Sequence, residues 1–416
     1  MILITNIKKL VQVEEQPRKF VAGAEMAKLD CIENAFLLIK DNLIEDFGSM
    51  NEIDRIEDKL DDDCLTELDA TGRMVFPSFC DSHTHLVYAG SREIEYTDKI
   101  KGLSYEEIAK RGGGILNSAQ LLHNTSEDDL YEQSLERVKE IIELGTGAVE
   151  IKSGYGLTVE DEVKMLRVIK RLRETTPIII KSTFLGAHAV PAEYKGRQTE
   201  YVDYIINEMI PAVAAEDLAD FVDVFCDKGF FTVEDTDRIL MSAMKYGMRP
   251  KIHANELDYS GGIQVGVKYD ALSVDHLEYT GDAEIESLLA SDTMPTLLPG
   301  AAFFLGMIDP PARKMIDAGL PLALASDFNP GSSPSGDMKF VMSLACVKMR
   351  LLPEEAINAT TINSAYAMGV SDIVGSIAKG KIANVFITKE IPSIEYMPYA
   401  YTTKLVDKVI LNGEII

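Results

Sequence analysis

The chain has 416 residues, of which 46% are hydrophobic, so it can bury the core of one large domain and a smaller one. Its 67 acidic and 41 basic residues give a formal net charge of −26, which argues against binding to nucleic acid or to an anionic membrane. Five widely spaced cysteines favour reduced thiols, and the sequence has neither a signal segment nor an apolar run of about 18 residues, so we expect a cytoplasmic protein.

The two ends of the chain have the same character. Residues 1–73 alternate short apolar strands with turns, and residues 375–416 do so again. Neither stretch alone is large enough for a complete core. We therefore expect a small β-sandwich domain formed from both chain termini, with residues 74–374 forming a separate domain between them.

In this central region, apolar runs alternate with amphipathic, acid-rich segments, which is typical of βα units and a parallel sheet. The predicted strands are 74–80, 147–152, 177–185, 221–226, 250–253, 271–275, 293–298 and 321–326. Predicted helices lie at 130–144, 159–173, 201–209 and 233–246. An open doubly wound sheet is the alternative, but eight units in about 250 residues favour an α/β fold of the (β/α)₈ TIM-barrel type.

The histidines follow the predicted strands. The chain has six, of which five lie at or near strand ends: His83, His85, His188, His253 and His276. The sixth, His123, lies in a polar helical stretch. A single histidine beside an apolar run is more often a core or surface residue, but five in such places indicate one shared site.

These positions predict a metal site at the carboxyl ends of the strands, where barrels of this type have their active sites. Side chains two apart on a strand point the same way, so His83 and His85 converge. With His253 and Asp327 they suit one divalent metal, zinc or ferrous iron, with a position left for water. Glu256 is the expected proton carrier. Taken alone, Glu256 could be an exposed loop carboxylate, and Asp327 could be a turn or helix cap.

The neighbouring strand ends refine this expectation. His276 can orient the water or stabilise developing charge. A binuclear centre would be expected to use a carboxylated lysine after the fourth strand, and the segment 222–227 has no lysine. Lys152 and Lys181 belong to the second and third strands, where they do not suit such a bridge. One metal ion is therefore the prediction.

Longer segments resemble the metal-dependent amidohydrolase superfamily. They are 81–92, 104–115, 150–157, 183–191, 275–279, 298–300 and 327–333, which together span the barrel. Within the superfamily, the Ser-Gly-Tyr-Gly, Gly-Ala-His and Asp-Phe-Asn-Pro-Gly-Ser segments are similar to those of enzymes that open an imidazolone ring. This resemblance implies hydrolysis of the ring C–N bond of 4-imidazolone-5-propanoate to N-formimidoyl-L-glutamate, a step of histidine degradation.

The same resemblance implies roles for individual residues. Metal ligands would be His83, His85, His253 and Asp327, and the catalytic groups Glu256, His276 and Asp327. Substrate contacts would be Arg92, Tyr105, Tyr155, His188, Glu256, Asn329, Gly331 and Ser332. Arg92 and the turn at 329–332 also suit an anionic propanoate tail, which needs donors in so acidic a protein. The chain departs from the usual motifs at Ser82 and Asn255, and neither is an expected ligand.

Three alternatives stay open. A deaminase of the same superfamily would also use His253, Glu256 and Asp327, although a nucleobase lacks the carboxylate that Arg92 suits. A catalytically inactive scaffold barrel would be expected to have lost ligands, and a barrel that merely binds metal or sugar fits less well still. For the enzyme we expect one divalent metal, zinc before iron, a small carboxylate-bearing substrate and, by analogy with related barrels, a homodimer.

Overall fold

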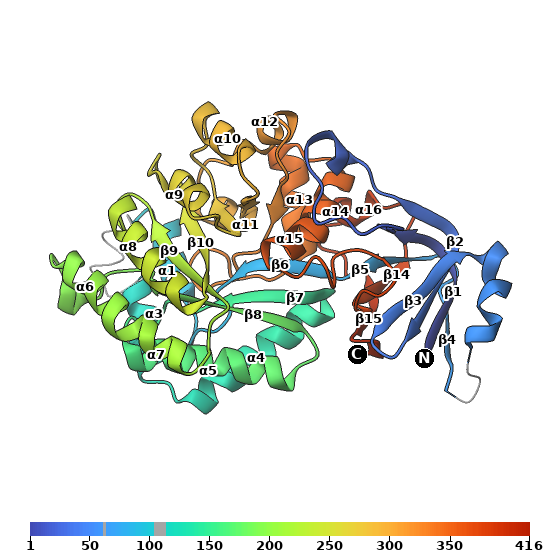
Figure 1. The fold of residues 1–416 in the computed structure, drawn as a ribbon, viewed down its shortest axis with the longest axis horizontal. Helices are drawn as coiled ribbons and strands as arrows, with labels where there is room; N and C mark the ends of the chain where they lie inside the picture. The colour runs from blue at the N-terminus through green and yellow to red at the C-terminus, as the bar shows by residue number, and fades with distance from the viewer. Residues whose placement is uncertain (61–63, 104–113) are drawn as a thin grey trace.

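The protein is described by a computed structural model over residues 1–60, 64–103 and 114–416. Over these residues the backbone forms two eight-stranded sheets, one a nearly closed parallel barrel and the other a mixed sheet. Figure 1 shows the barrel with its helices as one lobe and the mixed sheet as a second lobe, where both chain ends lie. The predicted barrel and the β domain built from both termini are confirmed. None of the described helices is long and apolar enough to cross a membrane.

The barrel strands are hydrogen-bonded in chain order, each parallel to the next. They are β6 (Phe79–Thr84), β7 (Thr146–Lys152), β8 (Ile179–Ala187), β9 (Phe221–Cys226), β10 (Arg249–Ala254), β11 (Ser273–His276), β12 (Met294–Leu297) and β13 (Ala323–Leu324). A parallel bridge between Thr84 and Phe328 brings the chain after β13 back to β6. Every residue of β6, β7 and β9 is buried, as expected for strands covered on both faces.

The terminal sheet has the strand order β16-β15-β14-β5-β1-β2-β3, with β4 paired to β1. Its strands are β1 (Ile2–Val11), β2 (Cys31–Lys40), β3 (Leu43–Ser49), β4 (Thr66–Asp69), β5 (Arg73–Pro77), β14 (Val385–Glu390), β15 (Val406–Leu411) and β16 (Glu414–Ile415). Side chains alternate between its two faces, since Leu37 packs in one cluster with Val385 while Phe36 and Leu38 pack in another with Ile56. The 3₁₀ helix η2 (Met50–Lys59), which carries Ile56, covers that second face.

The predicted first barrel strand, 74–80, is divided between the two sheets. Most of this run belongs to β5, which pairs antiparallel with β14, whereas β6 begins at Phe79 and pairs with β7. The backbone N–H of Ser78 donates to the carbonyl of Asn384, and that of Phe79 donates to the carbonyl of Gly145. The single-strand prediction was wrong because an apolar run does not reveal where the partner strand changes. The other seven predicted strands begin and end within two residues of observed ones.

Helices follow the barrel strands, and the last short helix lies between β14 and β15 of the terminal sheet. They are α1 (Glu93–Ile100), α3 (Ile115–His123), α4 (Glu127–Glu143), α5 (Val159–Thr175), α6 (Gln198–Tyr204), α7 (Ile210–Ala215), α8 (Val233–Ala243), α9 (Gly262–Lys268), α10 (Asp282–Leu289), α11 (Pro299–Leu305), α12 (Ala312–Asp317), α13 (Met338–Met349), α14 (Pro353–Thr360), α15 (Ile362–Ala367) and α16 (Tyr396–Tyr399). Short 3₁₀ turns are η1 (Gly23–Ala27), η3 (Ala192–Tyr194) and η5 (Met244–Tyr246). The side chains of Ser126, Thr158 and Thr232 cap α4, α5 and α8 by accepting a backbone N–H of the first turn.

The predicted helix at 201–209 takes a different form. It covers the end of α6 and a π-helical turn, η4 (Ile205–Met209), before α7 begins. Pro211 lies in the first turn of α7. Proline has no N–H and its ring clashes with the carbonyl four residues earlier, which the wider π turn relieves.

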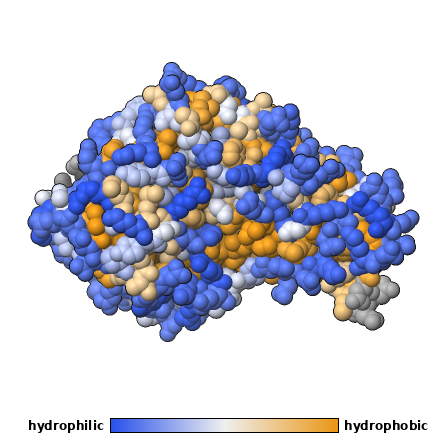
Figure 2. All heavy atoms as spheres, viewed as in Figure 1, coloured by the Kyte–Doolittle hydropathy of each residue, from blue (hydrophilic) through white to orange (hydrophobic). Residues whose placement is uncertain are grey.

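Aromatic packing joins the two lobes. The ring of Phe386 in β14 lies 5.3 Å from that of Phe76 in β5 and 5.0 Å from that of Phe79 in β6, measured between centroids. Figure 2 shows a mostly hydrophilic face, with a hydrophobic area in the middle of the view where the two lobes meet. The terminal sheet therefore rests on the barrel through apolar side chains and leaves the carboxyl ends of the barrel strands free of it.

Candidate metal centre and active site

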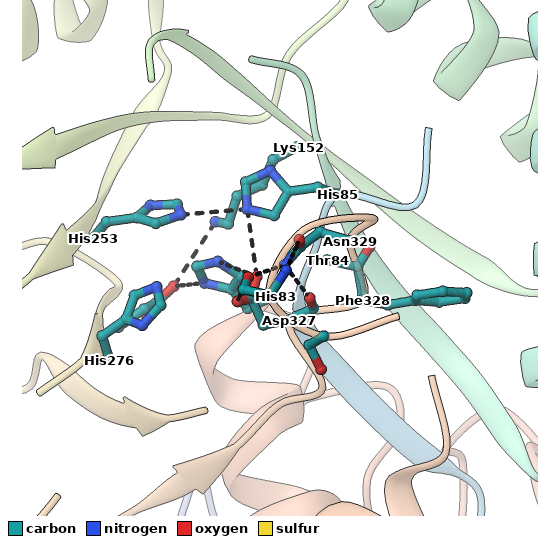
Figure 3. A network of polar contacts seen from close by, with 12 residues as sticks. His83, Thr84, His85, Lys152, His253, His276, Asp327, Phe328 and Asn329 are labelled. Carbon is teal, nitrogen blue, oxygen red and sulfur yellow. Dashed lines mark hydrogen bonds and ion pairs between the residues drawn. The ribbon is translucent and has the colours of Figure 1, made fainter. Parts of the chain in front are cut away.

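Three histidines converge at the carboxyl ends of the barrel strands. His83 lies near the end of β6, His85 follows that strand, and His253 lies in β10. All three are buried, and they offer ligand nitrogens that lie within 4.8 Å of one another. The Nε2 atoms of His85 and His253 are 3.3 Å apart. Figure 3 shows these rings gathered with that of His276, with the side chain of Asp327 beside His83 and His85.

The polar atoms at this point suit a cation. Among the residues that the structure describes, Nε2 of His83 is buried without a hydrogen-bond partner, and Nε2 of His85 faces Nε2 of His253. Oδ1 of Asp327 lies 3.6 Å from Nε2 of His83 and 3.6 Å from Nε2 of His85. Buried nitrogens facing one another without a donor between them are costly, and a shared cation satisfies them together. The three histidines could therefore hold one divalent metal ion, with Asp327 beside it.

Closure of the barrel positions Asp327. Its backbone N–H donates to the carbonyl of His83, at 3.0 Å, and the N–H of His85 donates to the carbonyl of Phe328, at 2.9 Å. Asp327 has a φ of 54°, a left-handed conformation that a non-glycine residue adopts at a cost. Burial raises the pKa of Asp327 to about 6, although His253 and hydrogen bonds with neighbouring side chains act in the opposite direction.

Two aspartate side chains fix the orientation of two of these histidines through their Nδ1 atoms. Nδ1 of His83 lies 2.6 Å from Oδ2 of Asp275, and Nδ1 of His253 lies 2.9 Å from Oδ2 of Asp223. A carboxylate accepts a hydrogen bond, so each pair places the imidazole proton on Nδ1 and directs the Nε2 lone pair to the centre. Neither aspartate is among the site residues predicted from the sequence.

A buried ion network lies behind these aspartates. Nζ of Lys152 is 2.9 Å from Oδ2 of Asp223, 2.5 Å from Oε1 of Glu150 and 3.8 Å from Oδ2 of Asp275. Lys251 also pairs with Glu150. Burial lowers the pKa of Lys152, but the three carboxylates outweigh that effect and raise it above its ordinary value. Lys152 thus stays charged and compensates the carboxylates that orient the histidines.

Glu256 and His276 lie on the adjoining strand ends. Oε2 of Glu256 is 3.8 Å from Nε2 of His276. The backbone N–H of Glu256 donates to Oδ2 of Asp227, at 2.7 Å, which fixes the loop after β10. Burial and the nearby carboxylates of Asp327 and Asp227 raise the pKa of Glu256 to about 8. Such a group can hold and release a proton near neutral pH.

Arg92 lies against the turn that follows β13. Its guanidinium donates two hydrogen bonds to Oε2 of Glu95, at 2.6 and 2.9 Å. A Cβ at Gly331 would come within 2.1 Å of Nη1 of Arg92, so glycine allows this approach. The N–H groups of Gly331 and Ser332 both donate to Oδ1 of Asn329, at 2.8 Å. These two N–H groups therefore form hydrogen bonds within the turn, although the sequence suggested them as donors to the carboxylate of the substrate.

Two further expected contacts form a wall beside the histidines. The ring of His188 stacks on that of His85 with centroids 5.1 Å apart, and lies 5.4 Å from that of Tyr155. Nδ1 of His188 donates to the carbonyl of Gly154, at 3.0 Å, which leaves Nε2 as the unprotonated nitrogen. Burial lowers the pKa of His188 to about 3, so its ring is neutral.

The remaining candidates lie elsewhere. Tyr105 falls outside the described residues. His123 is exposed and pairs with Asp161, away from the centre, as the sequence indicated. Lys99, which the sequence reasoning missed, donates to the carbonyl of Gly331, at 3.1 Å, and adds a cation next to Arg92. Lys99 follows no strand and lies in an ordinary amphipathic helix, so no sequence signal distinguished it.

Comparisons with known proteins identify relatives of the chain and a shared fold. A family model described as the amidohydrolase family matches residues 309–416. A protein of Christiangramia forsetii named imidazolonepropionase is 56% identical over 415 residues, covering 100% of both chains. One of Flavobacterium johnsoniae with the same name is 57% identical over 414 residues, covering 100% of this chain and 99% of that one. A solved triazine hydrolase variant shares the fold, with a TM-score of 0.75 at 15% identity over 100% of this chain and 94% of its own.

Proposed function

This chain belongs to the imidazolonepropionase family of amidohydrolases, and we propose that it opens the ring of 4-imidazolone-5-propanoate with water to give N-formimidoyl-L-glutamate. The observation that carries the proposal is the convergence of three buried imidazoles with Asp327 and Glu256 at one end of the barrel. These groups suit hydrolysis of a polar ring bond, and the cations beside them suit an anionic tail.

The histidines and Asp327 would hold the metal. His83, His85 and His253 supply three nitrogens and Asp327 an oxygen, a donor set that favours zinc and also accepts ferrous iron. A bound divalent metal lowers the pKa of a coordinated water from 15.7 to about 7, which makes it a nucleophile at neutral pH.

The protein's own residues would then manage the protons. Water adds to the carbonyl carbon of the ring, the bond from that carbon to the ring nitrogen breaks, and the nitrogen gains a proton. Asp327 accepts the proton of the attacking water through its carboxylate. Glu256 delivers a proton to the departing nitrogen, a role that suits a carboxyl group whose pKa is raised to about 8.

The substrate would be held from both sides. The guanidinium of Arg92, oriented by Glu95, pairs with the propanoate tail, and Lys99 adds charge next to it. The rings of His188 and Tyr155 line the other side of the imidazolone. Tyr105, Asn329, Gly331 and Ser332 complete the proposed contact set. A cytoplasmic location and a homodimer stay predictions from the sequence.

The test follows the loss of freshly made 4-imidazolone-5-propanoate, corrected for its spontaneous decay, with formimidoylglutamate and ammonia assayed before and after metal removal. We expect formimidoylglutamate without ammonia, and only from the metallated enzyme. The matched variants are His253→Gln, which should abolish turnover, and His123→Gln, which should leave it unchanged. Release of ammonia would instead indicate a deaminase, and no consumption by metallated protein would reject this substrate.

A further inference from the structure

Glu278 has a fully buried side-chain carboxyl group that lies beside His276. Among the residues that the structure describes, neither of its side-chain oxygens has a hydrogen-bond partner, and the same is true of Nδ1 of His276. Oε2 of Glu278 lies 3.9 Å from that nitrogen. Two unsatisfied polar groups so close together in the interior are costly unless they pair, and a small rotation of either side chain joins them.

The backbone brings these two side chains together. His276 and Leu277 both have positive φ angles, 86° and 71°, so the chain turns sharply at the end of β11. Two left-handed non-glycine residues in succession carry strain, which persists only where the surroundings enforce it. Here the N–H of Leu277 donates to the carbonyl of Ala254, at 3.1 Å, and the N–H of Tyr279 donates to the carbonyl of Asn255, at 2.9 Å. The loop after β10 thus fixes the turn that places Glu278 against His276.

The other ring nitrogen of His276 faces the reaction site. Nε2 lies 3.8 Å from Oε2 of Glu256, and the ring centroid is 5.3 Å from that of His253. Whichever group binds Nδ1 therefore decides whether Nε2 donates or accepts a hydrogen bond at the site.

We propose that Glu278 is a positioning residue whose protonated carboxyl group donates to Nδ1 of His276 and so keeps the imidazole proton on Nε2. The proposal rests on the function proposed above. His276 then donates from Nε2 to the negative charge that develops on the ring carbonyl oxygen, and it does not act as the base. Asp327 is left as the acceptor of the proton of the attacking water.

The protonation states agree with this arrangement. No described cation pairs with Glu278, and burial, reinforced by Glu256, raises its pKa well above the ordinary value. Burial lowers the pKa of His276, so that ring is neutral. The neutral carboxyl group has one proton, which it can donate to Nδ1, and the neutral imidazole keeps its own proton on Nε2.

The test compares Glu278→Gln, whose amide can still donate to Nδ1, with Glu278→Leu, which cannot. In zinc-loaded protein labelled with ¹⁵N-histidine, the signals of His276 report which nitrogen carries the proton; a His276→Asn variant assigns them. We expect the Nε2–H tautomer in the wild type and in the glutamine variant, and a mixture in the leucine variant. We also expect the leucine variant to lose about 10- to 100-fold in kcat with KM and zinc content unchanged, while the glutamine variant stays near the wild type.

The outcomes separate this proposal from the proposed function. The tautomer measurement needs no substrate, so it decides the role of Glu278 even if the wild type does not open the imidazolone ring. An Nδ1–H tautomer in the wild type would overturn the proposal. So would a leucine variant with wild-type tautomer and turnover, or equal losses of kcat in both variants together with equal falls in Tm, since those indicate a general packing role. Glu14→Gln, a buried glutamate of the terminal region, controls for the loss of a buried carboxyl group.

Discussion

Lys152 and Asp223 form a fully buried ion pair, with 2.9 Å between Nζ and Oδ2, directly behind the three-histidine centre. The same carboxylate oxygen lies 2.9 Å from Nδ1 of His253. One ammonium group therefore compensates the charge of a carboxylate that orients a metal-binding imidazole. The stability of the barrel and the geometry of the site depend on the same atoms.

Lys152→Met should be strongly destabilising. Removal of the ammonium group leaves Asp223 buried without its lysine and Glu150 with Lys251 alone, and breaking a buried pair in this way costs about 3–5 kcal/mol. Urea unfolding of the metal-free protein measures the change in the free energy of unfolding. Lys228→Met, which removes the exposed partner of Asp258, is the control and should have little effect. A wild-type unfolding curve for Lys152→Met would contradict the compensating role.

Asp223→Asn should weaken metal binding. The amide no longer ensures that Nδ1 of His253 carries the proton, so the Nε2 lone pair is less available, and we expect the affinity for zinc to fall about 10- to 100-fold. Competition with a chromophoric chelator measures this directly. Asp258→Asn, at a surface pair, should leave the affinity unchanged. An unaltered zinc affinity in Asp223→Asn would show that the aspartate does not tune this ligand.

The polar residues at the strand ends of the site could be predicted from the sequence, because each lies where an apolar run ends. His83 and His253 lie one residue before the ends of β6 and β10, and Asp327 follows β13. Parallel strands bring these carboxyl ends to one edge. Asp223 lies in the middle of β9, and Asp275 directly precedes His276 at the end of β11. A carboxylate in that position has the same sequence signature whether its partner is an imidazole, a lysine or water, so its contacts emerge only when neighbouring strands pair.

Two other features, the partner strands of the run at 74–80 and the contacts of Asn329, could not be predicted from the sequence, because they too depend on which groups pair in the folded chain. The run at 74–80 contains strands of two different sheets, since alternation and hydrophobicity do not encode the partner strand. At the turn after β13, Asn329 was expected to contact the substrate, yet its Oδ1 accepts two backbone N–H groups of its own turn. Side-chain types therefore indicated the location of the site, while the hydrogen-bond partners within it required the folded geometry.

The pH dependence of stability should reveal the buried Glu256. Its pKa is raised to about 8 in the folded protein, while in the unfolded chain it returns to about 4.3. Between these values the native state binds the extra proton, so the stability contributed by protonated Glu256 is lost as pH rises from about 5 to 8. In metal-free protein, the free energy of unfolding of the wild type should fall relative to Glu256→Gln by at most about 1.4 kcal/mol per pH unit. A difference independent of pH would contradict the raised pKa.

Gly331→Ala should impair binding of the substrate tail more than turnover. The new Cβ would lie 2.1 Å from Nη1 of Arg92, so the guanidinium must move away from the turn and from its place at the site. A hydrogen bond to a charged group contributes about 1.5–3 kcal/mol, and we expect KM to rise about 10- to 100-fold with a smaller change in kcat. Zinc content should be largely unchanged, because three of the four proposed ligands, the histidines, lie on other strands. As a control, binding of an imidazolone without the propanoate tail should be equal in the variant and the wild type, and a larger loss for that compound would place Arg92 at the ring rather than at the tail.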